Sequence, residues 1–74
     1  MKIGYIVHID DDATYVYLPG EDDLPIKKIK NSGKSFLDKI EDVKTFLKEE
    51  RGVKYIDEPK ITSKRKIEIF GSII

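Results

Sequence analysis

Residues 33–52 read GKSFLDKIEDVKTFLKEERG, the only stretch with helix signals at both ends and a helical stripe between them. Ser35 is a favoured N-cap residue because its hydroxyl can accept from a free backbone N–H of the first turn, and Asp38 completes a weak form of the capping box. Gly52 can adopt the left-handed conformation that closes a helix. Between them, apolar residues at steps of three and four predict one buried helix face: Phe36, Ile40, Val43 and Leu47, widened by Leu37 and Phe46.

The segments on either side of this helix show the alternation typical of strands. Residues 2–9 (KIGYIVHI), 14–18 (TYVYL) and 66–70 (KIEIF) predict strands, and the polar turn at residues 10–13 joins the first two into a hairpin. Residues 26–30 predict a shorter third strand at a sheet edge, where lysines discourage unwanted pairing. Residues 53–56 (VKYI) are expected to be extended, and residues 57–60 to form a turn around Pro59.

In order, these elements predict a single α+β domain over residues 1–74. One helix packs on one face of a small, mainly antiparallel sheet, in the order β-β-β-α-β. Because successive strand residues point to opposite sides, the helix is expected to cover one set of side chains and to leave a second set uncovered. The covered set is Tyr5, Val7, Val16 and Ile67; the uncovered set is Ile6, His8, Tyr15 and Tyr17, with Phe70 as a further candidate. An apolar face without a covering layer often marks a partner surface.

The composition narrows the classes of function. The chain has no cysteine, which excludes disulfides, thiolate nucleophiles and cysteine-based metal sites. No apolar run approaches the length of a membrane span and no signal-peptide pattern opens the chain, so a cytoplasmic location without membrane contact is the default expectation. The net charge of zero hides an asymmetry: residues 1–25 carry one lysine against six acids, and residues 26–74 carry thirteen basic residues against eight acids. Such polarity can orient a charged partner.

No set of residues predicts catalysis, a metal or a cofactor. Asp10, Asp11 and Asp12 are adjacent, so their carboxylates diverge, and a solvated turn is the favoured interpretation over a metal site. His8 is the only histidine, and a surface strand position is favoured over a catalytic role. Residues 31–35 (NSGKS) resemble the end of a phosphate-binding loop, but Lys28 stands where the loop requires its first glycine.

A cluster of basic residues near the C-terminus suggests an alternative function, which is nucleic-acid binding. In this hypothesis the cluster acts together with the helix start at residues 33–35. The cluster lacks the interleaved aromatic residues of a stacking platform, so solubility of a hairpin turn is the simpler interpretation. Its members are Lys60, Lys64, Arg65 and Lys66.

The chain as a whole resembles the N-terminal domain of HicB-type antitoxins. The resemblance lies in the order of short motifs: YIVHIDDDATYVYLPGEDDLP at residues 5–25, GKSFLDKIEDVKTFLKEE at 33–50, IDEP at 56–59 and KIEIF at 66–70. It implies a partial RNase H-like domain that is not a nuclease and that binds and masks a small basic mRNA-cleaving toxin of the HicA type. It also implies that residues 53–56 form a connector, in conflict with the extended segment expected from the residues.

The sequence departs from the pattern of that family at several positions. Lys39 stands where the family usually has alanine on the packed helix face, and Asp57 replaces the first proline of a Pro-Glu-Pro turn. The loop at residues 19–25 reads PGEDDLP instead of the usual Pro-Asp-Leu-Pro-Gly order. The C-terminal DNA-binding segment that many members carry has no counterpart in these 74 residues.

The leading expectation is a non-catalytic protein-binding domain of a toxin–antitoxin type, with a small basic partner and with the chain itself forming a homo-oligomer. The residues expected to meet that partner are Ile6, His8, Asp10, Asp11, Asp12, Tyr15 and Tyr17. Two alternatives stay open: a nucleic-acid-binding domain that uses the basic cluster, and a homo-oligomeric structural or accessory protein. In the second alternative, the uncovered sheet face pairs with its own copy.

Overall fold

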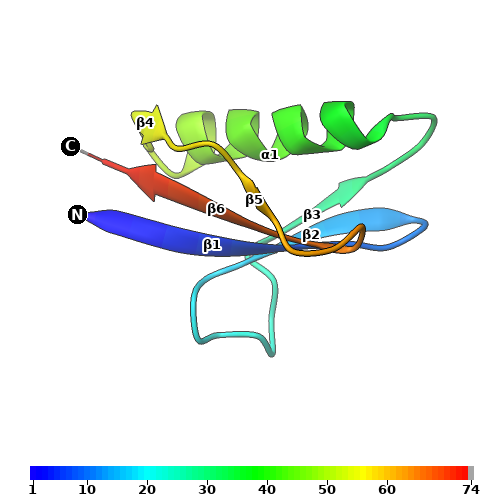
Figure 1. Ribbon diagram of the computed structural model, residues 1–74, viewed down its shortest axis with the longest axis horizontal. Coiled ribbons are helices and arrows are strands. Elements are labelled where there is room, and N and C mark those ends of the chain that lie inside the picture. The colour runs from blue at the N-terminus through cyan, green and yellow to red at the C-terminus, as the bar shows by residue number, and fades with distance from the viewer. Residues whose placement is uncertain (74) are drawn as a thin grey trace.

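The helix lies across one face of an antiparallel sheet in the computed structural model, which describes residues 1–73 (Figure 1). This arrangement confirms the α+β fold expected from the sequence. Two further strands of two residues each precede the last strand. The elements in chain order are β1 (Lys2–Ile9), β2 (Ala13–Tyr17), β3 (Lys27–Lys30), α1 (Phe36–Glu50), β4 (Tyr55–Ile56), β5 (Lys60–Ile61) and β6 (Lys66–Ser72).

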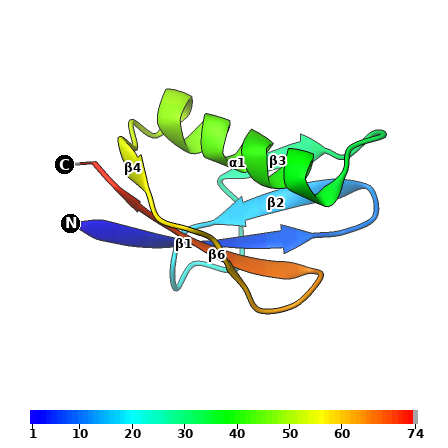
Figure 2. The same ribbon diagram turned by 45° about the horizontal axis from the view of Figure 1, so that its top comes forward.

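Strand β1 lies at the centre of the sheet. The strands follow one another across the sheet as β3-β2-β1-β6-β4 (Figure 2). Strand β5 also pairs with β6. Every pairing is antiparallel. The third strand therefore occupies an edge, as its lysines predicted.

Both helix ends form as the sequence indicates. The Ser35 hydroxyl accepts a hydrogen bond from the Asp38 backbone N–H at 3.2 Å. At the other end, the backbone N–H groups of Arg51 and Val53 both donate to the Leu47 carbonyl, at 3.2 and 3.0 Å. Gly52 makes this ending possible because its φ of 71° lies in the region that favours glycine.

The core lies between α1 and the covered face of the sheet. The helix contributes Ile40, Val43, Phe46 and Leu47, and the strands contribute Tyr5, Val7, Ile9, Val16, Ile67 and Ile69. The four strand residues expected beneath the helix are all buried. The prediction for Leu37 is wrong, since this side chain is 71% exposed. It lies on the flank of the helix next to Glu41, Pro59 and Ile61 and does not face the sheet.

The segment between α1 and β6 follows the edge of β6. Tyr55 and Ile56 pair with the end of β6, and Lys60 and Ile61 pair with its beginning. Pro59 falls in the gap between the two pairings, where its lack of an N–H costs no sheet hydrogen bond. The expected extended segment is therefore limited to two residues, and the expected turn at residues 57–60 ends in a strand residue.

Strand β6 also runs two residues beyond the predicted KIEIF segment. Gly71 lies inside it, and a Cβ atom there would approach Val53 Cγ1 to 2.7 Å. Glycine is therefore required at this position because the Val53 side chain occupies the space.

Candidate functional site

The side of the sheet away from α1, here called the open face, carries the side chains expected to remain uncovered. Directly opposed residues of neighbouring strands share a face. Ile6 lies opposite Tyr17 on β2 and Glu68 on β6, and His8 lies opposite Tyr15 and Lys66. Ile6, Tyr15 and Tyr17 are half-buried and His8 is exposed. The sheet brings the four together on a surface that no helix or further strand of residues 1–73 covers.

Two ring–lysine pairs and one ring–ring pair lie on the open face. The His8 and Tyr17 rings meet edge to face, with centroids 5.6 Å apart and planes at 78°. The Lys28 ammonium lies 5.9 Å from the centroid of the Tyr15 ring, and the Lys60 ammonium lies 5.4 Å from that of Phe70. Such cation–π contacts hold each lysine above a ring while its charge stays near water.

Phe70 belongs to this surface, as the alternation of the last strand suggested. It lies opposite Gly4 on β1, and a Cβ atom at Gly4 would come within 2.8 Å of the ring. The missing side chain of Gly4 thus makes room for Phe70 to lie across β1. A larger residue at position 4 would push the ring away from the sheet.

The loop of residues 19–25, here called the acidic loop, projects on the same side as the open face (Figure 1). A tight turn starts it: the Glu21 N–H donates to the Leu18 carbonyl at 3.1 Å, and Gly20 takes a φ of 76°. Glu21, Asp22 and Asp23 are exposed and form no ion pair with any residue between 1 and 73. The loop contains no basic residue, so it gives one end of the open face an uncompensated negative charge.

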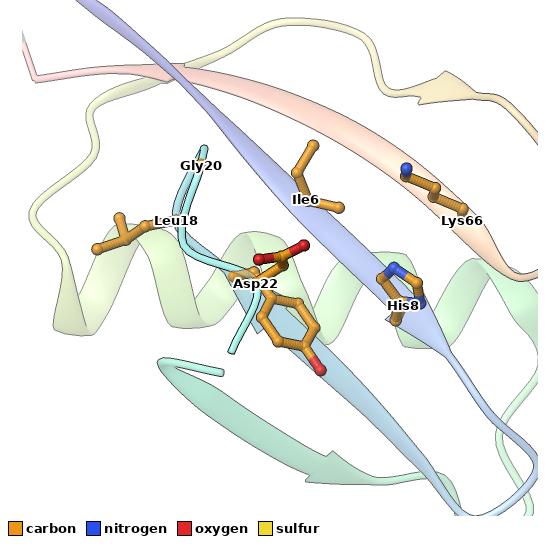
Figure 3. Close-up of a pocket in the computed structure, with 7 residues that line it drawn as sticks. Ile6, His8, Leu18, Gly20, Asp22 and Lys66 are labelled. Carbon is orange, nitrogen blue, oxygen red and sulfur yellow. The ribbon is translucent and has the colours of Figure 1, made fainter. Parts of the chain in front are cut away.

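A cavity of about 220 Å³ lies where the acidic loop meets the sheet. Figure 3 shows Gly20 and Asp22 on one side of Ile6, and His8 and Lys66 on the other. The full lining is Ile6, His8, Tyr17, Leu18, Gly20, Asp22 and Lys66. The cavity therefore has an apolar and aromatic floor, one acidic wall and one basic wall.

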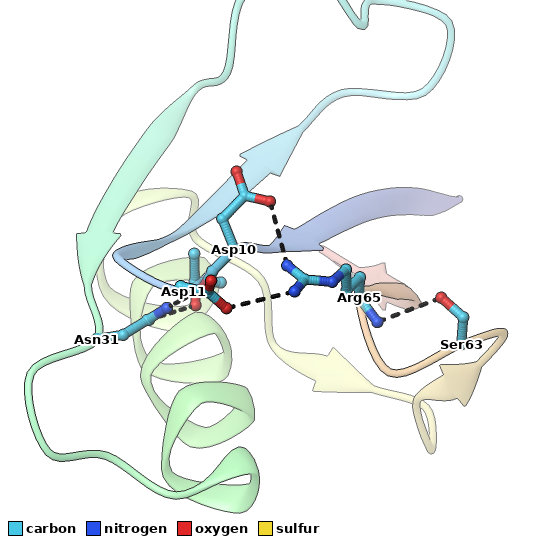
Figure 4. A network of polar contacts seen from close by, with 6 residues as sticks. Asp10, Asp11, Asn31, Ser63 and Arg65 are labelled. Atoms are coloured by element: carbon cyan, nitrogen blue, oxygen red, sulfur yellow. Dashed lines mark hydrogen bonds and ion pairs between the residues drawn. The ribbon is translucent and has the colours of Figure 1, made fainter.

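The aspartates at residues 10–12 lie at the opposite end of the hairpin and are partly compensated. Arg65 reaches the carboxylates of Asp11 and Asp10, at 3.3 and 3.9 Å (Figure 4). These three side chains are between 61% and 90% exposed, so the ion pairs add little stability. Their main consequence is to reduce the charge that this turn presents. Among residues 1–73, no group of three or more acidic or histidine side chains is arranged to hold a metal ion.

Asn31 is a buried polar residue to which the sequence interpretation gave no role. Its side-chain amide donates to the Asp10 carbonyl at 2.7 Å, and its side-chain oxygen accepts from the Thr14 hydroxyl at 2.7 Å (Figure 4). Its backbone N–H donates to the Asp12 carbonyl at 3.0 Å. Asn31 thus ties the end of β3 to the β1–β2 turn. The sequence feature that could have indicated this role is an asparagine directly after a strand, because its side-chain amide can both donate and accept hydrogen bonds.

The structure splits the basic cluster into two groups. Lys64 and Arg65 lie in the β5–β6 turn beside Asp10 and Asp11, whereas Lys60 and Lys66 lie on strands that border the open face. At the helix start, Lys34 forms an ion pair with Asp42. The four basic residues therefore do not all border the open face.

Lys39 does not occupy a packed position beneath the helix. It is half-buried and lines a hollow with Ile9, Phe36 and the two basic turn residues. Its aliphatic stem can lie against apolar atoms while its charge remains near water. The helix accordingly packs on the sheet without an alanine at this position.

Chemistry at His8 would need a nucleophile or an orienting acid at hydrogen-bond range. The contact that the structure gives its ring is the edge of Tyr17. Among the serines, Ser35 caps the helix and Ser63 accepts from the Arg65 N–H at 3.2 Å. His8 and the carboxylate-bearing Asp22 both line the cavity described above.

Within residues 1–73, no helix has the length and apolar character needed to cross a membrane. Comparison with known proteins finds no matching family model, no matching curated protein and no matching solved structure.

Proposed function

We propose that this chain is a non-catalytic protein-binding domain that uses its open face to hold a small basic protein. The observation that carries the proposal is that the acidic loop projects on the side of the sheet away from α1 (Figure 1), where Tyr15, Tyr17 and His8 lie. Apolar faces rimmed by charge are typical of partner surfaces, and aromatic residues are enriched in the centres of interfaces. The uncompensated charge of Glu21, Asp22 and Asp23 would steer a basic partner to this end of the face.

The resemblance to HicB-type antitoxins makes the proposed partner more specific. It names a small basic toxin that cleaves mRNA and that the domain would mask. Tyr15 and Tyr17 on the open face would then form the centre of the masking surface, with Ile6 and His8 beside them. Asp10 and Asp11 would contribute less than the acidic loop, because Arg65 already compensates them.

The test uses the small basic protein encoded beside this chain in its native genome, purified together with the intact chain. We expect Tyr17→Ala to weaken the complex about tenfold to a hundredfold, as measured by isothermal titration calorimetry, because truncation of a central aromatic side chain typically costs that much. Masking is measured separately, as loss of RNA cleavage by the partner. Leu37→Ala is the control: this side chain is apolar and 71% exposed, but it lies on the helix.

Equal affinities for the Tyr17 and Leu37 variants would refute the assignment of the open face. Light scattering of the chain alone tests the second possible occupant, which is another copy of the chain. A dimer that Tyr17→Ala dissociates would mean that the face is covered by self-association and would contradict the proposal.

Nucleic-acid binding is a second candidate because of one observation. The sequence shows no aromatic residue within the basic cluster, but the fold places Lys60 over Phe70 and Lys28 over Tyr15 on one face. Basic side chains beside aromatic rings are typical of surfaces that bind single strands. The acidic loop opposes this function, since it lies on the same side and would repel phosphates.

Fluorescence anisotropy with a labelled single-stranded RNA tests this second candidate. If it holds, affinity falls steeply as salt rises, because phosphate contacts release counterions. Phe70→Ala should then weaken binding several-fold by removing a stacking ring. Absence of binding at low salt would eliminate the candidate.

A further inference from the structure

The cavity on the open face is the size of one side chain. Its volume of about 220 Å³ is below the roughly 300–1,000 Å³ of pockets that enclose drug-sized ligands and cofactors. The floor consists of Ile6 and the Tyr17 ring, both half-buried. Such a floor suits the aliphatic stem of a long side chain or a flat group that can stack on a ring.

The charges of the two walls fix which way such a side chain would lie. Asp22 forms no ion pair within residues 1–73, and its neighbours Glu21 and Asp23 add negative potential on the same side. Lys66, on the opposite wall, would repel a cation. A positively charged head group would therefore lie at the Asp22 wall. A side chain bound in the opposite direction would place its charge beside Lys66 and would be repelled.

From this arrangement we infer that the cavity receives an arginine side chain of the basic partner. The guanidinium would lie against the Asp22 carboxylate and the Tyr17 ring, with its stem on Ile6. A planar guanidinium can bind a carboxylate with two parallel hydrogen bonds and stack on an aromatic face, and a lysine ammonium can do neither. Arginine is also among the residues that most often anchor an interface.

This inference rests on the proposed function but can be tested without the partner. The probe is N-acetyl-arginine amide, compared with N-acetyl-citrulline amide, which has nearly the same shape and no charge. Titration of the ¹⁵N-labelled chain, followed by NMR, should give saturable shifts at Ile6, Tyr17, Gly20 and Asp22. Binding in the millimolar range is expected for the arginine compound and should be several-fold weaker for the citrulline compound.

Two substitutions separate a site from general attraction to an acidic protein. Asp22→Asn should weaken binding of the arginine compound several-fold. Asp12→Asn removes the same charge from an exposed aspartate that does not line the cavity, and it should leave the affinity unchanged. Equal losses in both variants, or equal shifts with the citrulline compound, would overturn the inference.

The cavity and the function can fail independently. If the arginine compound does not bind at Ile6 and Asp22 while Tyr17→Ala still weakens the partner complex, the open face remains the interface and only the arginine site is refuted. If the arginine compound binds there but no open-face variant alters the partner complex, the site stands and the proposed function is refuted.

Discussion

Leu47→Ala is expected to lower the free energy of unfolding by about 3–5 kcal/mol, because it removes a completely buried side chain and leaves a cavity. Leu47 lies in the last turns of α1, within the core cluster that joins the helix to the sheet. The free energy of unfolding of a small domain is only about 5–15 kcal/mol in total, so this variant would keep little of its stability. Thermal unfolding followed by circular dichroism should show a midpoint lowered by at least about 12 °C.

Leu37→Ala provides the matched control, since the same atoms are removed from the same helix. Because Leu37 is 71% exposed, the free energy of unfolding should change by less than about 0.5 kcal/mol. Similar losses in the two variants would mean that the helix packs on a different face from the one described. The comparison therefore tests the orientation of α1 as well as the contribution of one leucine.

The helix was predicted well because its signals are local. Ser35, Asp38 and Gly52 define its ends by hydrogen bonds and backbone conformation within a few residues. Leu37 was misplaced because it lies at the border of the apolar stripe, where the position of the neighbouring strands decides whether a side chain is covered. The position of those strands depends on the order of strands in the sheet, and the periodicity of one helix gives no information about that order.

The candidate site was predictable only in part for the same reason. Alternation along β1 and β2 predicted which side chains would remain uncovered, and Ile6, His8, Tyr15 and Tyr17 do share one face. The contacts of Lys60 with Phe70 and of Lys28 with Tyr15 depend on strand register. The side on which the acidic loop leaves the sheet depends on a few backbone angles near Gly20, and composition does not encode them.

Asn31→Ala is expected to lower the free energy of unfolding by about 2–3 kcal/mol, the second largest effect predicted for this chain. The substitution leaves the Thr14 hydroxyl and the Asp10 carbonyl without the partners that they have at 2.7 Å. The expected loss is large because Asn31 is only 5% exposed. Water therefore cannot readily take over the hydrogen bonds that the Asn31 amide makes. Urea denaturation measures the change, and Ser32→Ala, at the exposed next position, should change stability by less than about 0.5 kcal/mol.

A double-mutant cycle with Thr14→Val shows whether the hydrogen bond itself is responsible. Thr14→Val keeps the shape of the buried side chain but removes the hydroxyl that donates to Asn31. If this hydrogen bond contributes to stability, the double variant should lose about 1 kcal/mol less than the sum of the single variants, because the second substitution removes a group that the first has already left unpaired. Additive losses would mean that Asn31 acts through the Asp10 carbonyl alone. The β1–β2 turn would then be held by one side-chain hydrogen bond, and Asn31→Asp, which cannot donate to that carbonyl, should destabilise the fold as much as Asn31→Ala.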